Sequence, residues 1–355
     1  MRGKTRLVGI GITLLCLGLA FYGVDYKALL GALATANYVL ILPAVSLWLI
    51  GYVARTVRWR TILVGAGAGG GSVVELFGVL MIGFATNNLL PARLGELARA
   101  YLLRRRTGQR KTFVLASIFL ERVFDGLALV AVILVLSYLV KPPAWDREVD
   151  IAANVRLIEL VATITFVGIA VAIAVLLYRH ELAIRIFGHL ARALPTRLNR
   201  FATGAFAAFV NGLSSMRRPG VVLGTALLSA AVWAIEWGAY VVVASAFDLG
   251  LPTPQLAAAC ALLLVVVNLG IMLPAAPGYV GTFQFFAVSA LAVWGVPREL
   301  ALAVAIVAHL TQFVLVTAIG LAFFGREHLS LRTMADASRE SGDGEAEVAI
   351  SEVRS

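Results

Sequence analysis

The sequence predicts an all-α, polytopic membrane protein with about eight transmembrane helices and one re-entrant helix. Hydrophobic residues make up 60% of its 355 residues and charged residues only 14%, whereas a soluble domain is about half apolar and about a quarter charged. Apolar runs recur from Leu7 to Phe324, and a helix needs about 20 residues to cross a bilayer core roughly 30 Å thick. Residues 1–325 therefore read as one integral membrane domain.

The positions of the basic residues indicate which ends of the spans face the cytoplasm. Of the 30 lysines and arginines, 20 lie in four stretches, at residues 2–6, 55–60, 93–111 and 179–218. Basic segments next to membrane spans stay on the cytoplasmic side, which explains the net charge of +10 without a nucleic-acid partner. We expect a multi-pass protein of the cell inner membrane with both termini in the cytoplasm.

Eight apolar segments fit this topology in chain order. The first follows basic residues and resembles a signal peptide, but many spans follow it, so it is interpreted as an uncleaved span. Residues 326–355 are polar and are expected to form a disordered cytoplasmic tail. The predicted spans cover residues 7–23, 37–56, 113–140, 157–178, 221–247, 255–273, 279–294 and 300–325.

A further apolar run, Val73–Leu90, has basic stretches on both sides. Both flanks favour the cytoplasm, so a full crossing would leave one of them on the opposite side. A re-entrant element at about residues 73–91 resolves the conflict, because non-helical backbone is tolerated at membrane depth where protein or water covers it. A complete span with one misplaced basic flank is the alternative.

The first candidate site follows this run. Pro91 cannot continue a preceding helix and suits the first turn of a new one, whose free N–H groups form a natural phosphate site. Arg93 would add a charge-assisted contact, and Asn87 and Asn88 would cap or line the turn. The segment therefore predicts a site for a phosphate.

Three ionisable residues, Glu121, Arg122 and Asp125, lie in the cytoplasmic third of the span at 113–140. At 3.6 residues per turn they share one sector of the helix, and each unpaired charge at mid-bilayer costs about 2.5–3.5 kcal/mol. They must face protein or water, so an ion-pair staple for the re-entrant helix and a lipid-head site both remain open. Candidate partners of opposite charge in the first candidate site are Arg93, Glu96 and Arg99.

Residues 255–294 form the second interrupted element, a broken apolar hairpin. Pro274, Pro277 and three glycines break it, and such breaks need cover by protein or water. The pattern Pro-x-x-Val-Gly from Pro277 echoes Pro-x-x-Leu-Gly from Pro91. Paired interrupted helices in two halves are typical of a transporter with an inverted repeat and a central site. A chance similarity between two Pro/Gly turns is the alternative.

Glu236 lies near the middle of the span at 221–247, which makes it a functional candidate by default. It is equally compatible with a structural hydrogen bond to Gln312 or Asn268. The chain's histidines show no metal-ligand spacing, both cysteines lie in apolar runs, and no nucleophilic constellation occurs. We therefore predict no metal, no cofactor and no catalytic residue.

Three motifs in this order resemble the flippase-like membrane domain of the lysylphosphatidylglycerol synthases. They are Asn-x-x-Pro-x-Arg-x-Gly-Glu-x-x-Arg at residues 88–99, Glu-Arg-x-x-Asp at 121–125 and Pro-x-x-Pro-Gly-x-x-Gly at 274–281. The resemblance covers about residues 7–325. It implies lipid-site candidates at Asn88, Pro91, Arg93, Gly95, Glu96, Arg99, Glu121, Arg122, Asp125, Pro277, Gly278 and Gly281. To these the broken hairpin and the mid-span acid add Glu236, Pro274 and Gln284.

The resemblance implies that membrane lipids are the partners and that an anionic, aminoacylated or glycosylated lipid moves between leaflets. An acidic residue is expected soon after the second Pro-Gly turn, where this chain has Thr282 and Gln284. No soluble aminoacyl-transfer domain is recognised, so we expect no synthesis of lysyl-lipid.

Two other functions remain open. The first is a membrane-bound glycosyl or acyl transferase with a lipid-linked donor and Glu96 or Asp125 as the base. The second is a non-transporting scaffold for a lipid-modifying enzyme. The sequence indicates no particular oligomeric state.

Overall fold

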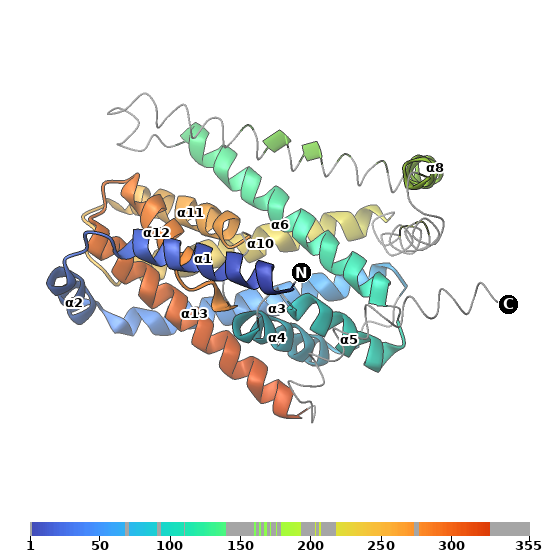
Figure 1. Cartoon of the computed structure of the whole chain (residues 1–355), viewed down its shortest axis with the longest axis horizontal. Coiled ribbons are helices and arrows are strands. Elements are labelled where there is room, and N and C mark those ends of the chain that lie inside the picture. Colours follow the sequence, from blue (N-terminus) through green and yellow to red (C-terminus); the bar gives the residue numbers. More distant parts are fainter. Residues whose placement is uncertain are drawn as a thin grey trace.

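The computed structural model describes residues 2–67, 71–90, 94–109, 111–139, 179–192, 218–272 and 277–326, with isolated positions between 160 and 206. These residues form helices and no strand, so the all-α prediction is confirmed. The helices, shown in Figure 1, are α1 (Arg2–Phe21), α2 (Tyr26–Thr35), η1 (Tyr38–Leu40), α3 (Ile41–Gly65), α4 (Val73–Leu89), α5 (Gly95–Thr107), α6 (Lys111–Leu139), α8 (His180–Ala191), α10 (Pro219–Ala244), α11 (Thr253–Gly270), η4 (Pro277–Tyr279), α12 (Thr282–Ala292) and α13 (Arg298–Arg326).

Four helices of the described chain are long and apolar enough to cross a membrane: Tyr38–Gly65, α10, α11 and α13. The bent pair Gly11–Phe21 and Tyr26–Thr35 makes a fifth candidate if it counts as one span. Most of the predicted span at 157–178, and the tail after residue 326, lie outside the described residues. A polytopic membrane protein is thus confirmed, and the number of about eight spans stays a prediction.

The helix ends follow from local sequence. Ser72 and Glu75 form a capping box at the start of α4, with each side chain accepting a hydrogen bond from the other residue's backbone N–H, which satisfies two otherwise unpaired donors. Pro219 opens α10 at a position where no backbone donor is needed. Gly108 ends α5 in the left-handed conformation, with φ of 71°.

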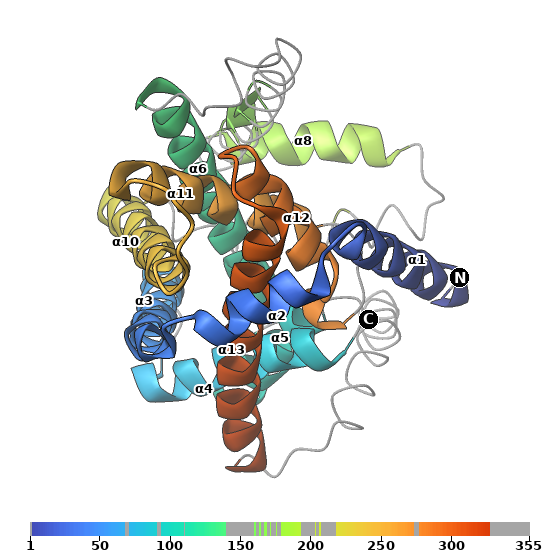
Figure 2. The same ribbon diagram turned by 90° about the vertical axis from the view of Figure 1, so that its left-hand side faces the viewer.

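Helix α13 is central to the bundle and packs against α2, α3, α4, α10 and α12. Residues 24–36, which the topology assigns to an exterior loop, contain α2, and Figure 2 shows this helix lying across α13. Asp25 caps α2 by accepting hydrogen bonds from the backbone N–H groups of Lys27 and Ala28, so a short helix forms where only a loop is expected.

Helices α4 and α5 form a tight hairpin. A Cβ atom at Gly95 would collide with the carbonyl oxygen of Gly83, so the two helices touch backbone to backbone. At the open end of the hairpin, the guanidinium of Arg106 donates to the carbonyl oxygen of Glu75 at 3.4 Å. The chain thus enters and returns on the same side, which is the geometry that a re-entrant element requires; its depth in a membrane stays a prediction.

The close contact in this hairpin predicts the effect of one methyl group. Gly95→Ala places a Cβ against the backbone oxygen of Gly83 and 2.6 Å from the Asn87 side-chain oxygen, and overpacking of this kind typically costs about 1–3 kcal/mol. We expect a lower unfolding free energy in a denaturant titration in mixed micelles. The control Gly224→Ala, where the nearest atom is at 3.9 Å, should leave stability unchanged or higher. Equal stability of the two variants would contradict the hairpin geometry.

Candidate functional site

Eight charged side chains from α3, α5, α6 and α10 form a continuous series of ion pairs inside the bundle. Four are arginines and four are carboxylates, so the series carries no net charge. We call it the charge ladder, and its members are Arg55, Arg58, Glu96, Arg99, Glu121, Arg122, Asp125 and Glu236.

Arg58 is the centre of the ladder. It is only 1% exposed and lies on α3, facing two acids that are one turn apart on α6. Its Nη1 atom is 2.6 Å from Asp125 Oδ1, and its Nη2 atom is 3.5 Å from Glu121 Oε1. The same Nη1 also donates to the Ser229 hydroxyl at 2.9 Å. One arginine therefore connects α3, α6 and α10.

The ladder continues from this centre in two directions. Towards α5, Arg99 Nη2 lies 2.6 Å from Glu121 Oε2. Towards α10, Arg55 Nη2 lies 2.7 Å from Glu236 Oε2. The second oxygen of Glu236 accepts a hydrogen bond from the Gln312 amide at 2.9 Å, which extends the network to α13.

Arg122 is the loosest member of the ladder. Its side chain is 44% exposed, and its nitrogens lie 3.5 Å from Glu96 and 3.7 Å from Asp125. These distances are longer than those of a strong charge-assisted hydrogen bond, about 2.7–2.9 Å. Arg122 can therefore exchange partners more readily than the buried arginines.

Two tryptophans support the buried arginines. The guanidinium carbon of Arg99 lies 4.1 Å from the ring centroid of Trp59, and that of Arg55 lies 5.0 Å from the ring of Trp233. Trp233 also donates its indole N–H to Asp125 at 3.1 Å. Rings at these distances attract the cations through their electron-rich faces, so Arg55 and Arg99 are each held by an aromatic ring as well as by a carboxylate.

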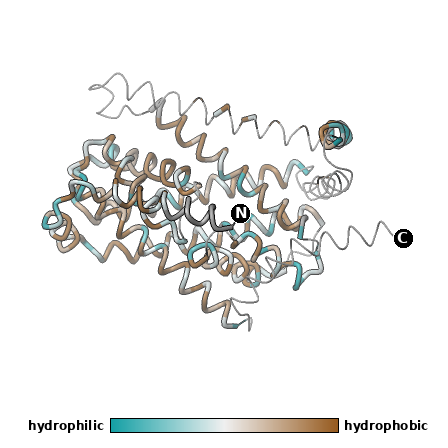
Figure 3. The backbone as a smooth tube through the Cα atoms, viewed as in Figure 1, coloured by the Kyte–Doolittle hydropathy of each residue, from teal (hydrophilic) through white to brown (hydrophobic). Residues whose placement is uncertain are grey.

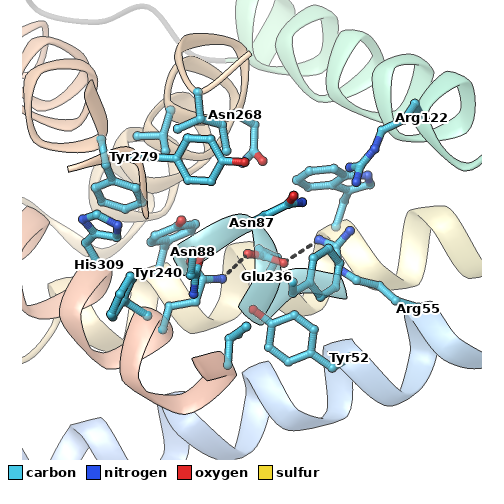
Figure 4. A pocket seen from close by; sticks show the side chains of 18 of the residues that line it. Tyr52, Arg55, Asn87, Asn88, Arg122, Glu236, Tyr240, Asn268, Tyr279 and His309 are labelled. Carbon is cyan, nitrogen blue, oxygen red and sulfur yellow. Dashed lines mark hydrogen bonds and ion pairs between the residues drawn. The ribbon is translucent and has the colours of Figure 1, made fainter. Parts of the chain in front are cut away.

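One cavity of about 170 Å³ opens beside the ladder, and Figure 4 shows its lining. Four ladder members reach its wall: Arg55, Glu96, Arg122 and Glu236. Both interrupted elements also contribute, through Asn87 and Asn88 at the end of α4 and Asn268 and Tyr279 on either side of the second break. A cavity of this size with a polar wall can hold several water molecules.

The first break is fixed by its asparagines. The side-chain oxygen of Asn87 accepts a hydrogen bond from the backbone N–H of Gly95 at 2.7 Å, so it caps the start of α5 across the break. The amide of Asn88 donates to the Thr317 hydroxyl at 3.0 Å. The predicted phosphate site at this helix start is therefore partly occupied by the chain's own side chain.

The second break is fixed by His309, which stacks on Phe283. One ring nitrogen lies 3.0 Å from the Gln284 amide and the other 2.8 Å from the Gly278 carbonyl oxygen. Gln284 in turn accepts a hydrogen bond from the backbone N–H of Gly281 at 2.7 Å. Positions 278 and 281 both have positive φ, 72° and 86°, which glycine adopts without strain.

The predicted site residues thus fall into four groups. Asn88, Glu96, Arg122 and Glu236 line the cavity. Arg99, Glu121 and Asp125 lie in the buried ladder away from its wall. Gly95, Pro277, Gly278, Gly281 and Gln284 shape or fix the breaks. Pro91, Arg93 and Pro274 lie outside the described residues.

The pairing within the ladder differs from the simplest expectation. Glu96 and Arg99 are spaced to pair with each other, but Glu96 pairs with Arg122 and Arg99 pairs with Glu121. In the described chain Asp125 takes its closest partner from α3, where Arg58 approaches it to 2.6 Å. The crossed pairs join α5 to α6, which a pair within α5 would not do.

Arg55 and Arg58 were missed as site residues because their charges mark a cytoplasmic flank. The predicted span at 37–56 ends at these charges, whereas α3 continues to Gly65 with both arginines buried. Their spacing of three residues and the apolar residues 62–64 that follow are the available signal. Arg60, the third basic residue of this stretch, is exposed, as a flanking residue should be.

A family model described as the lysylphosphatidylglycerol synthase TM region matches residues 6–320. The chain belongs to this family. The match confirms the resemblance carried by the three motifs, and together with the apolar helices it supports a multi-pass membrane protein with a lipid-related role.

Two relatives match this chain over only part of their own length. Glycosyltransferase AglD of Haloferax volcanii is 28% identical over 375 residues, which is 99% of this chain and 59% of that protein. A UPF0104 membrane protein of Methanocaldococcus jannaschii is 38% identical over 53 residues, 15% of this chain and 23% of that protein. The chain spans less than two thirds of the length of both relatives, and no solved structure matches it. One relative is a glycosyltransferase by name, which leaves an enzymatic role open.

The ladder predicts a large stability loss when its centre is removed. Arg58→Met leaves the carboxylates of Asp125 and Glu121 buried without their shared arginine, and breaking a buried ion pair costs about 3–5 kcal/mol. We expect this loss in the unfolding free energy measured by denaturant titration in mixed micelles. The matched control is Arg185→Met in α8, whose ion pair with Glu181 is about three quarters exposed and contributes little. Similar losses in the two variants would show that the ladder does not hold the bundle together.

Proposed function

We propose that the protein moves a lipid between the two leaflets of the membrane, with the head group passing through the cavity beside the charge ladder. One observation carries this proposal: both interrupted elements and two ion pairs of the ladder line a single polar cavity. Paired broken helices at a central site are typical of proteins with alternating access. Membership of the lysylphosphatidylglycerol synthase TM family supports a lipid as the cargo.

The outer surface of the bundle suits the remainder of such a lipid. Large apolar side chains are exposed along the long helices, among them Leu14, Leu223, Leu227 and Leu310, and Figure 3 shows hydrophobic residues over much of their length. Acyl chains can therefore stay in the bilayer while the head group alone takes a polar path. Such a path removes most of the cost of moving a charged or hydroxylated group through hydrocarbon.

The outer pair of the ladder provides the first contacts for a head group. Arg122 and Glu96 have side chains that are 44% and 22% exposed, and they are 3.5 Å apart. Either residue can turn to a head group without breaking a short hydrogen bond. Arg55 and Glu236 form a tighter pair deeper in the network, which keeps the interior neutral when the outer pair opens.

A flipping assay tests this function. Purified protein is reconstituted into liposomes that contain fluorescent phosphatidylglycerol, phosphatidylethanolamine, lysylphosphatidylglycerol or a hexosyl-phosphoryl lipid, and dithionite bleaches the outer leaflet. We expect the protein to accelerate exchange of at least one lipid. Glu96→Gln and Arg122→Gln should slow that exchange about tenfold, which corresponds to a barrier about 1.4 kcal/mol higher.

The control for these variants is Glu181→Gln in α8, which alters an exposed ion pair away from the cavity. It should exchange lipid at the unaltered rate. Exchange no faster than in protein-free liposomes for all four lipids would refute the translocase function. Unaltered rates in folded Glu96→Gln and Arg122→Gln would remove the outer pair from the path.

A membrane-bound transferase is the second candidate, because one relative is a glycosyltransferase by name. Among the described carboxylates, Glu96 suits the role of the base, because one of its oxygens is buried and has no hydrogen-bond partner within the described residues. Incubation of the purified protein with a radiolabelled hexosyl-phosphoryl lipid and an acceptor would decide between the candidates. Label transfer that Glu96→Gln abolishes would favour the transferase.

A further inference from the structure

We infer that the lipid head group that this cavity accepts is a single sugar ring joined to the lipid through a phosphate. The inference rests on the proposed function, because it names the class of lipid that would use that path. Three features of the cavity support the inference. The charged groups in its wall are paired with opposite charges, its asparagines have unused hydrogen-bond donors and acceptors, and its wall contains aromatic rings.

The charged groups in the cavity wall are balanced in pairs. Arg55 is paired with Glu236, and Arg122 with Glu96, so two positive and two negative groups face the same space. A head group with a large net charge of either sign finds no surplus of opposite charge there. A neutral ring with hydroxyl groups meets no such conflict.

Three asparagines of the wall use one amide atom for the fold and leave the other unused. Asn87 accepts from Gly95 through its oxygen, while Asn88 donates to Thr317 and Asn268 donates to the Leu264 carbonyl through their nitrogens. Within the described chain, the remaining amide atom of each asparagine has no hydrogen-bond partner. These atoms are also absent from the set of fully buried polar atoms without a partner, so they are accessible. They are therefore open to a ligand.

These unused atoms are one donor and two acceptors. An ammonium group can only donate hydrogen bonds, and a phosphate can only accept them, whereas each hydroxyl does both. A ligand with several adjacent hydroxyls therefore satisfies the Asn87 amide N–H₂ and the oxygens of Asn88 and Asn268 together. A bare phosphate cannot do this, and an aminoacyl group offers its ammonium donors and a single ester carbonyl acceptor rather than a set of adjacent hydroxyls.

The cavity wall also contains flat rings. Tyr52, Trp233, Tyr240 and Tyr279 contribute to it, and Figure 4 shows the labelled tyrosines Tyr52, Tyr240 and Tyr279 around the cavity, with Asn87 and Asn268 close by. A sugar ring has an apolar C–H face that packs on an aromatic ring while its hydroxyls bond at the edge. Small-molecule sites combine apolar walls with a few placed polar groups in this way.

The phosphate belongs next to Arg122. This side chain is 44% exposed and makes only contacts of 3.5 and 3.7 Å with carboxylates, so it can turn to a phosphate and make a shorter, charge-assisted bond. Its position at the exposed side of the cavity wall places the phosphate between a sugar inside and acyl chains outside.

The test compares lipids that differ by one group. Native mass spectrometry of the detergent-purified full chain measures binding of a hexosyl-phosphoryl lipid, the lipid phosphate with the same chains, phosphatidylglycerol and lysylphosphatidylglycerol. We expect the hexosyl-phosphoryl lipid to bind at least about tenfold more tightly than the other three, the effect of one or two well-placed hydrogen bonds. Free hexose 1-phosphate should compete only weakly, because it lacks acyl chains.

A matched pair of variants locates the effect. Asn268→Leu preserves size and removes the free amide oxygen, and it should reduce binding of the hexosyl-phosphoryl lipid about tenfold while binding of the lipid phosphate stays unchanged. Gln255→Leu removes an amide from the same helix outside the cavity wall and should change neither. The comparison of lipids on the unaltered protein stands even if a variant fails to fold.

The outcomes separate this inference from the proposed function. Binding and flipping of phosphatidylglycerol or lysylphosphatidylglycerol in preference to the hexosyl-phosphoryl lipid would overturn the inference and leave a translocase. Selective binding of the hexosyl-phosphoryl lipid without any flipping would support the inference and refute the translocase. If free hexose 1-phosphate binds as tightly as the hexosyl-phosphoryl lipid, the inference that the ligand is a lipid would be overturned.

Discussion

The bundle depends on the requirement that every charge buried among apolar helices has a partner. Four arginines and four carboxylates meet this requirement as one neutral series, and the helices α3, α5, α6 and α10 each supply members. Breaking such a series leaves an uncompensated charge in a poorly solvated place. These ion pairs therefore constrain the positions of the four helices relative to one another, in addition to apolar packing.

The cavity is a consequence of the same arrangement. Its charged wall consists of two pairs of the ladder, the outer pair Arg122 with Glu96 and the deeper pair Arg55 with Glu236, while the other members do not reach the cavity. The members away from the cavity fix the geometry of the helices, and the two pairs in the wall line the cavity. A single network thus combines rigidity, which a folded membrane protein needs, with two pairs of charges that remain within reach of a ligand.

Much of the fold and of the candidate site is predictable from particular residues. Proline and glycine predict both breaks, and the charges on α6 predict a buried polar cluster. Gln312 is one of the two partners expected for Glu236, and the structure confirms this hydrogen bond. The roles of Arg55 and Arg58 were not predictable, because a basic residue at the end of an apolar run reads as a flank. The choice of partners depends on helix packing, which brings Arg58 to Asp125 and Glu121. Residue spacing along the chain does not reveal such a contact. Likewise, only the tertiary structure brings the two breaks together in the wall of one cavity.

The contact between the two breaks limits how the protein can move. A Cβ at Gly278 would approach the carbonyl oxygen of Asn88 to 3.3 Å and the ring of Phe313 to 2.8 Å, so the second interrupted hairpin rests directly on the main chain of the first. No side-chain rotation can loosen a contact made by backbone. A tilt of one hairpin that preserves this contact therefore carries the other hairpin with it, so the two breaks are mechanically coupled.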